Sequence, residues 1–153
     1  MPKFNAKLLD GSESSENKGN QDWWQSNPMT YDWDKNLGEP IFDAEYFLNI
    51  DEIFGDGHSL INNPNWPDGS ILENFIPYES LHGKHVLEIG CGAGLVSSHI
   101  SRAGAKLHAI DLTEQAISMT QKRFELGNLT GEIRQMDAEK LEFSDNSMDV
   151  IVS

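Results

Sequence analysis

The chain has 153 residues, of which 38% are apolar, so it is long enough for one compact domain with a hydrophobic core and too short for two. Its 25 acidic residues outnumber 11 basic ones and give a net charge of -14, which would repel a phosphate backbone, so no nucleic-acid partner is expected. No apolar run is long enough for a secretion signal or a membrane span, and we expect a soluble, cytoplasmic protein. The single cysteine, Cys91, excludes an intramolecular disulfide and a multi-cysteine metal site.

The first third of the chain combines a polar start with a dense group of aromatic residues. Residues 10–22 carry no apolar side chain that could anchor them, and we expect residues 1–22 to be disordered. Residues 23–82 are expected to form an extension of helical and aromatic segments. Its first aromatic side chains either cover a ligand site as a lid or anchor the extension on the main domain, and the sequence favours neither role. These aromatic residues are Trp23, Trp24, Tyr31 and Trp33.

Further along this extension, local patterns predict two helices separated by a turn. Apolar residues recur at helical spacing over residues 43–54, and two glycines end the pattern, which predicts an amphipathic helix. Residues 62–69 are rich in turn formers, and residues 70–75 are expected to form a short helix that stops before a proline. The main domain is expected to cover residues 83–153.

Short strands and helices alternate through the main domain. The expected strands span residues 85–89, 106–110, 132–136 and 149–152. One helix is expected over residues 95–103, and a second is expected to begin at a Thr113 cap and end at Gly127. The buried stripe of the second helix is expected to consist of Ile117, Thr120 and Phe124. This alternation predicts an α/β fold, with a Rossmann-like parallel sheet that is covered by helices on both faces.

Three glycines stand in the five residues of the turn 90–94, which joins the first predicted strand to its helix. Glycine lets the backbone turn sharply and approach a ligand without a Cβ in the way, so we expect the amides of this turn to face a ligand. Ligands of such sheets lie beyond the C-terminal ends of the strands. The dinucleotide-binding pattern G-x-G-x-x-G would need a small residue at position 95, where this chain has Leu95.

The stretch VLEIGCGAG resembles motif I of the class I S-adenosylmethionine-dependent methyltransferases. Residues 83–153 follow that family in order, and their sequence looks most like the small-molecule branch that includes quinone-biosynthesis enzymes. The resemblance implies S-adenosyl-L-methionine as cofactor, a small-molecule methyl acceptor and a sheet of seven strands, of which this chain ends inside the fourth. We therefore expect it to be a fragment of a longer protein.

Each predicted binding residue has a proposed role and a simpler alternative. Asp111 follows the second strand, where a carboxylate can accept hydrogen bonds from both ribose hydroxyls, or it simply flanks the following helix. The resemblance implies that Leu112 packs against the adenine and that Asp137 and Ala138 read its edge, although Asp137 also fits an ordinary turn. It further implies that Glu88 faces the ligand's ammonium group, unless that acid only borders the site. The expected cofactor-binding residues are Glu88, Gly90, Cys91, Gly92, Gly94, Asp111, Leu112, Asp137 and Ala138.

The sequence identifies no catalytic residue and no metal ligands. Cys91 has no histidine nearby in sequence and is interpreted as a small packing residue rather than a nucleophile. The five histidines are scattered without the spacing of a metal site. Methyl transfer can proceed by holding the reactants in line, so a catalytic base is not always required. Two alternatives stay open, namely a cofactor-binding remnant without catalysis and a nicotinamide-dependent oxidoreductase, which Leu95 opposes.

Overall fold

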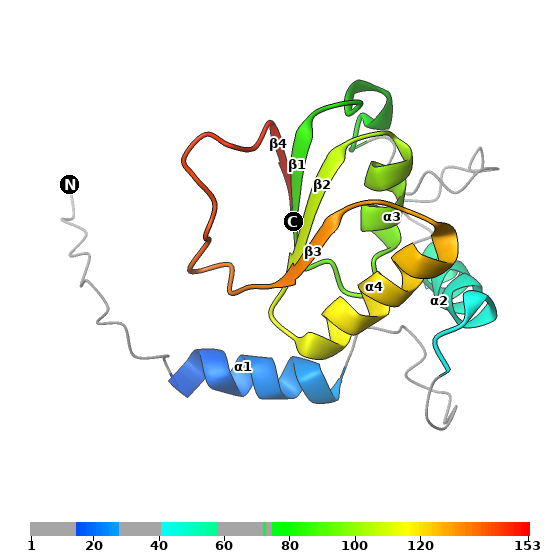
Figure 1. Cartoon of the computed structure of the whole chain (residues 1–153). Coiled ribbons are helices and arrows are strands. Elements are labelled where there is room, and N and C mark those ends of the chain that lie inside the picture. Colours follow the sequence, from blue (N-terminus) through cyan, green and yellow to red (C-terminus); the bar gives the residue numbers. More distant parts are fainter. Residues whose placement is uncertain (1–14, 28–40, 58–71, 73–74) are drawn as a thin grey trace.

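The computed structural model describes residues 15–27, 41–57, 72 and 75–153. The N-terminal part contains the helices α1 (Ser15–Ser26) and α2 (Ala44–Gly57) and the short 3-10 helix η1 (Tyr78–Ser80). The remaining elements are β1 (His85–Ile89), α3 (Leu95–Arg102), β2 (Lys106–Asp111), α4 (Glu114–Gly127), β3 (Glu132–Gln135) and β4 (Val150–Val152) (Figure 1). No helix in these described ranges is long and apolar enough to cross a membrane.

The four strands form one parallel sheet in the order β3-β2-β1-β4. In its register Glu88 of β1 lies between Ala109 of β2 and Val152 of β4. The C-terminal ends of β1, β2 and β3 therefore meet at one edge, as a Rossmann-like α/β fold requires. Every strand and helix predicted from residue 85 onward is present, with ends that differ by at most one residue.

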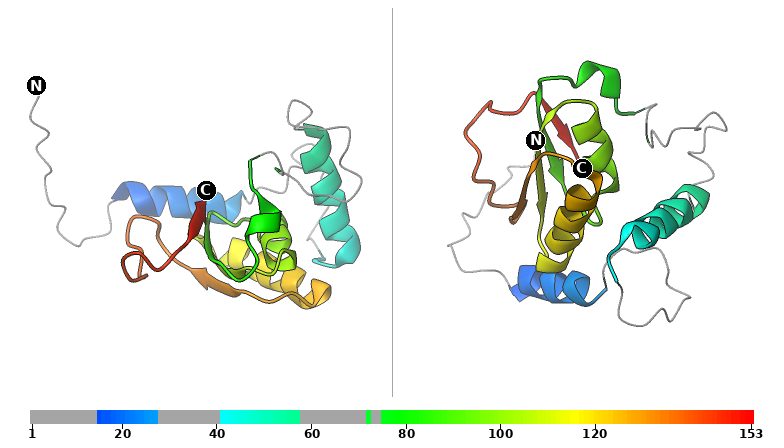
Figure 2. Two further views of the ribbon diagram at one scale, coloured as in Figure 1. Left: turned by 90° about the horizontal axis from the view of Figure 1, so that it is seen from above. Right: turned by 45° about the vertical axis from the view of Figure 1, so that its right-hand side comes forward.

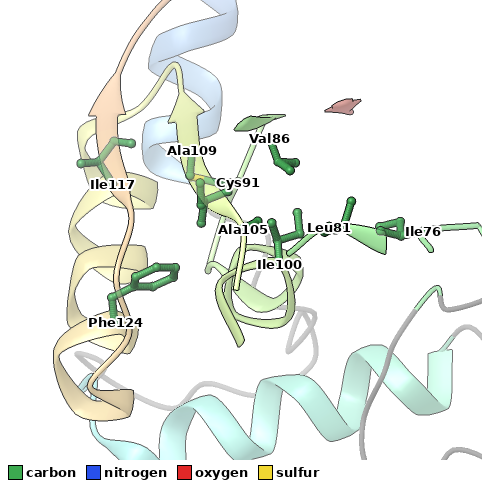
Figure 3. Packing of buried hydrophobic residues seen from close by; sticks show 10 residues of the cluster. Ile76, Leu81, Val86, Cys91, Ile100, Ala105, Ala109, Ile117 and Phe124 are labelled. Carbon is green, nitrogen blue, oxygen red and sulfur yellow. The ribbon is translucent and has the colours of Figure 1, made fainter. Parts of the chain in front are cut away.

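Both helices of the main domain pack against the same face of the sheet. Their core contains Val86 and Ala109 from the strands, Ile100 from α3 and Phe124 from α4 (Figure 3). The opposite face is covered by the connection between β3 and β4, which contributes Met136 and other apolar side chains to a second cluster. Figure 1 shows this connection on the side of the sheet away from α3 and α4.

This arrangement differs from the expected helices on both faces. Residues 137–149 are mostly polar, include a turn at Ser144 to Ser147 and contain Asn146 with φ 58°, so they run as a loop. Strand β4 is an edge strand within the described residues, and Ile151 is 59% exposed.

Helix α4 shows how local signals define its two ends. The Thr113 hydroxyl accepts a hydrogen bond from Ala116 N–H at 3.3 Å, as an N-cap residue does. At the other end Asn128 takes the left-handed conformation and closes the helix after Gly127. The predicted stripe of Ile117, Thr120 and Phe124 is buried.

Helix α1 crosses the boundary that was expected between residues 22 and 23. The Gln21 side-chain amide donates to Leu112 O at 3.2 Å, and the Gln25 side-chain oxygen accepts from Gln115 N–H at 3.4 Å. Polar side chains thus hold α1 against the start of α4, below the sheet in Figure 1. Trp23 is 56% exposed and does not anchor the helix.

Helix α2 packs on the outer side of α4 (Figure 2). Phe47 and Ile50 of α2 form a small cluster with Met119 of α4, and Ala93 of the glycine turn packs against it. The predicted turn at 62–69 and Tyr31 and Trp33 lie outside the described residues, as does most of the helix expected at 70–75.

Candidate functional site

A cavity of about 550 Å³ lies at the C-terminal ends of β1, β2 and β3 and is bordered by residues of α1 and α2. Eight of the nine predicted binding residues line it. They are Glu88, Gly90, Cys91, Gly92, Asp111, Leu112, Asp137 and Ala138. These residues lie together because they stand at or just after the C-terminal ends of strands that meet at one edge of the sheet.

The ninth predicted residue, Gly94, does not line the cavity. It is buried with φ 76°, and a Cβ at this position would lie 2.9 Å from the Thr120 side chain. Gly94 thus permits close packing of the turn on α4. By contrast, Gly90 and Gly92 also have positive φ, but a Cβ on either would meet no protein atom within 4 Å. These two glycines leave space open for a ligand.

Most amides of the glycine turn do not face the cavity, which corrects the sequence-based expectation. Gly90 and Cys91 N–H both donate to Ile110 O, at 2.8 and 3.0 Å. Gly92 N–H donates to Asp111, and Gly94 N–H donates to Cys91 O. The turn is so tight that its own neighbours satisfy these donors. The first turn of α3, whose N-cap Gly94 provides no side-chain cap, keeps N–H groups available for an anion.

Asp111 braces the turn and the following helix at the same time. Its Oδ2 accepts from Gly92 N–H at 3.0 Å, and its Oδ1 accepts from Thr113 N–H at 3.0 Å and from the Thr113 hydroxyl at 3.1 Å. The simpler alternative, a helix-flanking acid, therefore describes these contacts. Each carboxylate oxygen can accept more than one hydrogen bond, so the carboxylate also has capacity for a ligand.

Glu88 is a buried acid on the cavity wall, with a side chain only 6% exposed. Burial raises its pKa to about 7, the hydrogen bond from Ser97 Oγ opposes that rise, and the charge of Asp111 adds to it. The carboxyl is thus easily ionised by a cationic ligand and costly to ionise without one.

Asp137 and Leu112 complete the wall that β2 and β3 provide. Asp137 Oδ1 accepts from Glu139 N–H at 2.9 Å, and Asp137 O accepts from Lys140 N–H at 2.9 Å, as in an ordinary turn. The Leu112 carbonyl accepts from the side chains of Gln21 and Gln135, and Leu112 also lines the cavity.

Cys91 is buried beside Thr120, whose hydroxyl lies 3.6 Å from the sulfur. Burial raises the pKa of this thiol to about 12, so the nucleophilic thiolate does not form at neutral pH. The interpretation as a packing residue agrees with these contacts.

We predict that the Cys91 thiol of the folded chain resists a disulfide reagent such as Ellman's reagent at pH 8. It should react at least about a hundredfold faster in a denaturant, which exposes the thiol and restores its ordinary pKa. The rate of thionitrobenzoate release measures this difference. Rapid reaction of the folded chain would contradict the buried position of the sulfur.

Sequence reasoning missed the contribution of α2 and α4 to the cavity and left the role of the first aromatic residues open. Trp24 of α1, Ile50 and Phe54 of α2, and Met119 and Arg123 of α4 all line it. Trp24 is 41% exposed, and its position favours the predicted lid role over the anchor role. In the sequence, the group of aromatic residues near position 24 was the only sign of this part of the cavity wall.

Among the described residues, no group of three or more His, Cys, Asp or Glu side chains could hold a metal ion.

Comparison with known proteins finds similarity to methyltransferases. The model of the methyltransferase domain matches residues 86–153. A ubiquinone biosynthesis O-methyltransferase of Actinobacillus pleuropneumoniae serotype 7 is 39% identical over 59 residues, which cover 39% of this chain and 25% of that protein. A phthiotriol/phenolphthiotriol dimycocerosates methyltransferase of Mycobacterium leprae is 38% identical over 94 residues, which cover 60% of this chain and 34% of that protein.

Among solved structures, the magnesium protoporphyrin IX methyltransferase of Synechocystis PCC 6803, determined with bound SAH, is similar over 88% of this chain and 56% of its own. The TM-score is 0.57 at 18% identity, so this likeness shows the fold. The chain spans about a quarter to a third of the length of the two curated relatives.

Proposed function

We propose that the chain binds S-adenosyl-L-methionine in the cavity and serves methyl transfer to an oxygen or carbon atom of a small-molecule acceptor. The match of residues 86–153 to the methyltransferase domain model supports this proposal. The observation that carries this proposal is the meeting of Glu88, Asp111 and Asp137 on one cavity wall, beside two glycines that leave space open. That wall offers an acid for an ammonium group, an acid for ribose hydroxyls and a polar loop for a base.

The residues present suit this cofactor in each of its parts. The free N–H groups at the start of α3 would hold the carboxylate of its methionine part, and Glu88 would hold the ammonium group. Asp111 would accept from the ribose, while Leu112, Asp137 and Ala138 would surround the adenine. The cofactor supplies a methyl group on an already activated sulfonium, so the chain acts mainly by binding and orientation. We name no catalytic base among the described residues.

The acceptor and the location of the protein are also part of this proposal. A net charge of -14 suits a small molecule better than a nucleic acid, and one buried cysteine suits the cytoplasm. Leu95, which lines the cavity where the dinucleotide pattern needs a small residue, speaks against a nicotinamide cofactor.

Calorimetric titration of the chain with S-adenosylhomocysteine, and separately with NADH, tests this function. We expect the first ligand alone to bind, and Asp111→Asn to weaken it by about tenfold or more, because one charged acceptor is lost. Asp149→Asn is the matched control, since Asp149 also accepts a backbone N–H, from His85 at 2.8 Å, and does not line the cavity. Binding of NADH, or of neither ligand by a folded chain, would overturn the proposal.

A further inference from the structure

One buried guanidinium connects the N-terminal extension to the glycine turn. Arg123 of α4 is 8% exposed and donates from its two terminal nitrogens to the two carboxylate oxygens of Asp51 in α2, at 2.8 and 2.7 Å. Its Nε donates to Ala93 O, inside the turn, at 2.6 Å. The guanidinium carbon also lies 4.5 Å from the centre of the Phe47 ring of α2.

These contacts use the geometry that only arginine provides. Its planar fork matches a carboxylate with two parallel hydrogen bonds, and the third N–H in the same plane reaches the carbonyl of Ala93. A lysine ammonium carries its three donors on one nitrogen and lacks this planar fork. The directional hydrogen bonds of Arg123, together with its charge, therefore fix the position of α2 relative to the turn.

The same face of α4 fixes the turn itself. The Thr120 hydroxyl, one helical turn before Arg123, donates to Gly92 O at 2.9 Å. Two successive carbonyls, of Gly92 and Ala93, are thus held by α4. We call the contacts of Arg123 with Asp51 and Ala93 the Arg123 clamp. Beyond Asp51, Ile50 and Phe54 of α2 line the cavity, so any shift of α2 changes the cavity wall.

We propose that Arg123 is a positioning residue, which fixes α2 over the glycine turn through Asp51 and so completes the cofactor cavity. This proposal rests on the proposed function, because the ligand of the cavity is taken to be the methyl donor. The role concerns residues 72 positions apart in sequence, on the two helices that flank the turn. Arg123 acts through its neighbours, and we assign it no contact with reacting atoms.

Hydrogen exchange by mass spectrometry and calorimetry with S-adenosylhomocysteine test the proposal on the same samples. The variants are Arg123→Met, which keeps an unbranched apolar stem, Asp51→Asn, and the combination of both. Lys122→Met is the matched control, since Lys122 is the neighbouring cation on α4 and pairs with Glu125 on the surface at 2.9 Å. Asp51→Asn leaves the Arg123 contact to Ala93 in place, and it carries the test if Arg123→Met does not fold.

We expect hydrogen exchange in α2 and in residues 90–94 to accelerate by about tenfold or more in each variant, because the Arg123 clamp prevents local opening there. Strands β1 and β2 should stay protected. The ligand affinity should fall by about tenfold, and the combined variant should fall no further than Arg123→Met alone, because both changes remove one interaction. Lys122→Met should leave both readouts unchanged.

Two results would overturn the positioning role without touching the proposed function. One is unchanged exchange in α2 in the folded variants, and the other is full ligand affinity in Arg123→Met. Acceleration of exchange throughout the sheet would also count against it, since that describes a general stabilising role. Failure of the unaltered chain to bind S-adenosylhomocysteine would reject the proposed function, and the exchange of α2 would still decide whether Arg123 fixes this helix.

Discussion

Gly94→Ala should destabilise the chain by about 2–4 kcal/mol, while Gly90→Ala should cost only about 1 kcal/mol and instead weaken ligand binding. Both glycines have positive φ, 76° and 79°, so both alanines carry the conformational cost. Only at position 94 does the new methyl meet the Thr120 side chain at 2.9 Å and its Cα at 3.2 Å. Backbone must then move to relieve the contact.

Thermal melting and calorimetry with S-adenosylhomocysteine distinguish the two variants. For a chain of this size, the loss expected for Gly94→Ala lowers the Tm by about 6–12 °C. Gly90→Ala should melt close to the unaltered chain and bind the ligand about tenfold more weakly or worse, because its methyl occupies the open space of the cavity. Equal melting temperatures for the two variants, or full affinity in Gly90→Ala, would contradict the separate roles assigned to these glycines.

The main domain could be predicted closely because its signals are local. The Thr113 cap, the glycines at the ends of the helices and the change from helical to alternating periodicity define the elements between residues 85 and 135. Topology then follows from short right-handed connections, and it brings Glu88, Asp111 and Asp137 to one edge.

The direction of the amides in the glycine turn could not be predicted from the same pattern. Three glycines announce a sharp turn, but the partner of each N–H depends on which atoms lie next to it in the fold. Ile110 O and the Asp111 carboxylate take three of these donors. Gly94 illustrates the same limit, because only the position of Thr120 shows that this glycine serves packing.

The contacts that hold the N-terminal helices against the main domain could not be predicted for a related reason. Helix α1 is held by Gln21 and Gln25, whose polar side chains contact the backbone at the start of α4 and leave no hydrophobic pattern in the sequence. Asp51 and Arg123 each look like ordinary charged residues of the solvent-facing side of a helix. Their pairing across 72 positions exists only once α2 and α4 are packed together.

Ligand affinity should depend strongly on pH through Glu88, rising by about thirtyfold between pH 5.5 and pH 8. Burial raises the pKa of this acid to about 7 in the chain without ligand. A bound ammonium group would favour the ionised form, so binding must release the proton that Glu88 carries at acidic pH. Calorimetry of S-adenosylhomocysteine binding in buffers of different ionisation enthalpy measures both the affinity and the released proton.

Glu88→Gln is the variant that isolates this effect. It should bind about 10 to 100 times more weakly than the unaltered chain at pH 8, because a charge-assisted hydrogen bond is lost. At about pH 5.5, where Glu88 itself is protonated, the two affinities should converge. A pH dependence that persists in Glu88→Gln would place the titrating group elsewhere.

The stability of the chain without ligand should change in the opposite sense. Between the ordinary pKa of 4.5 and the folded value of about 7, the folded chain retains a proton on Glu88 that the unfolded chain has lost. The stability this provides is full below pH 4.5 and is lost as the pH rises through 7, by up to about 3 kcal/mol. Glu88→Gln lacks this loss, so denaturant unfolding at pH 8 should show it to be the more stable protein. At pH 8 the buried Glu88 carboxylate thus lowers the stability of the free chain and raises its affinity for a cationic ligand, as expected for a binding residue. If Glu88→Gln instead lowered both the stability and the ligand affinity at pH 8, Glu88 would be a structural residue.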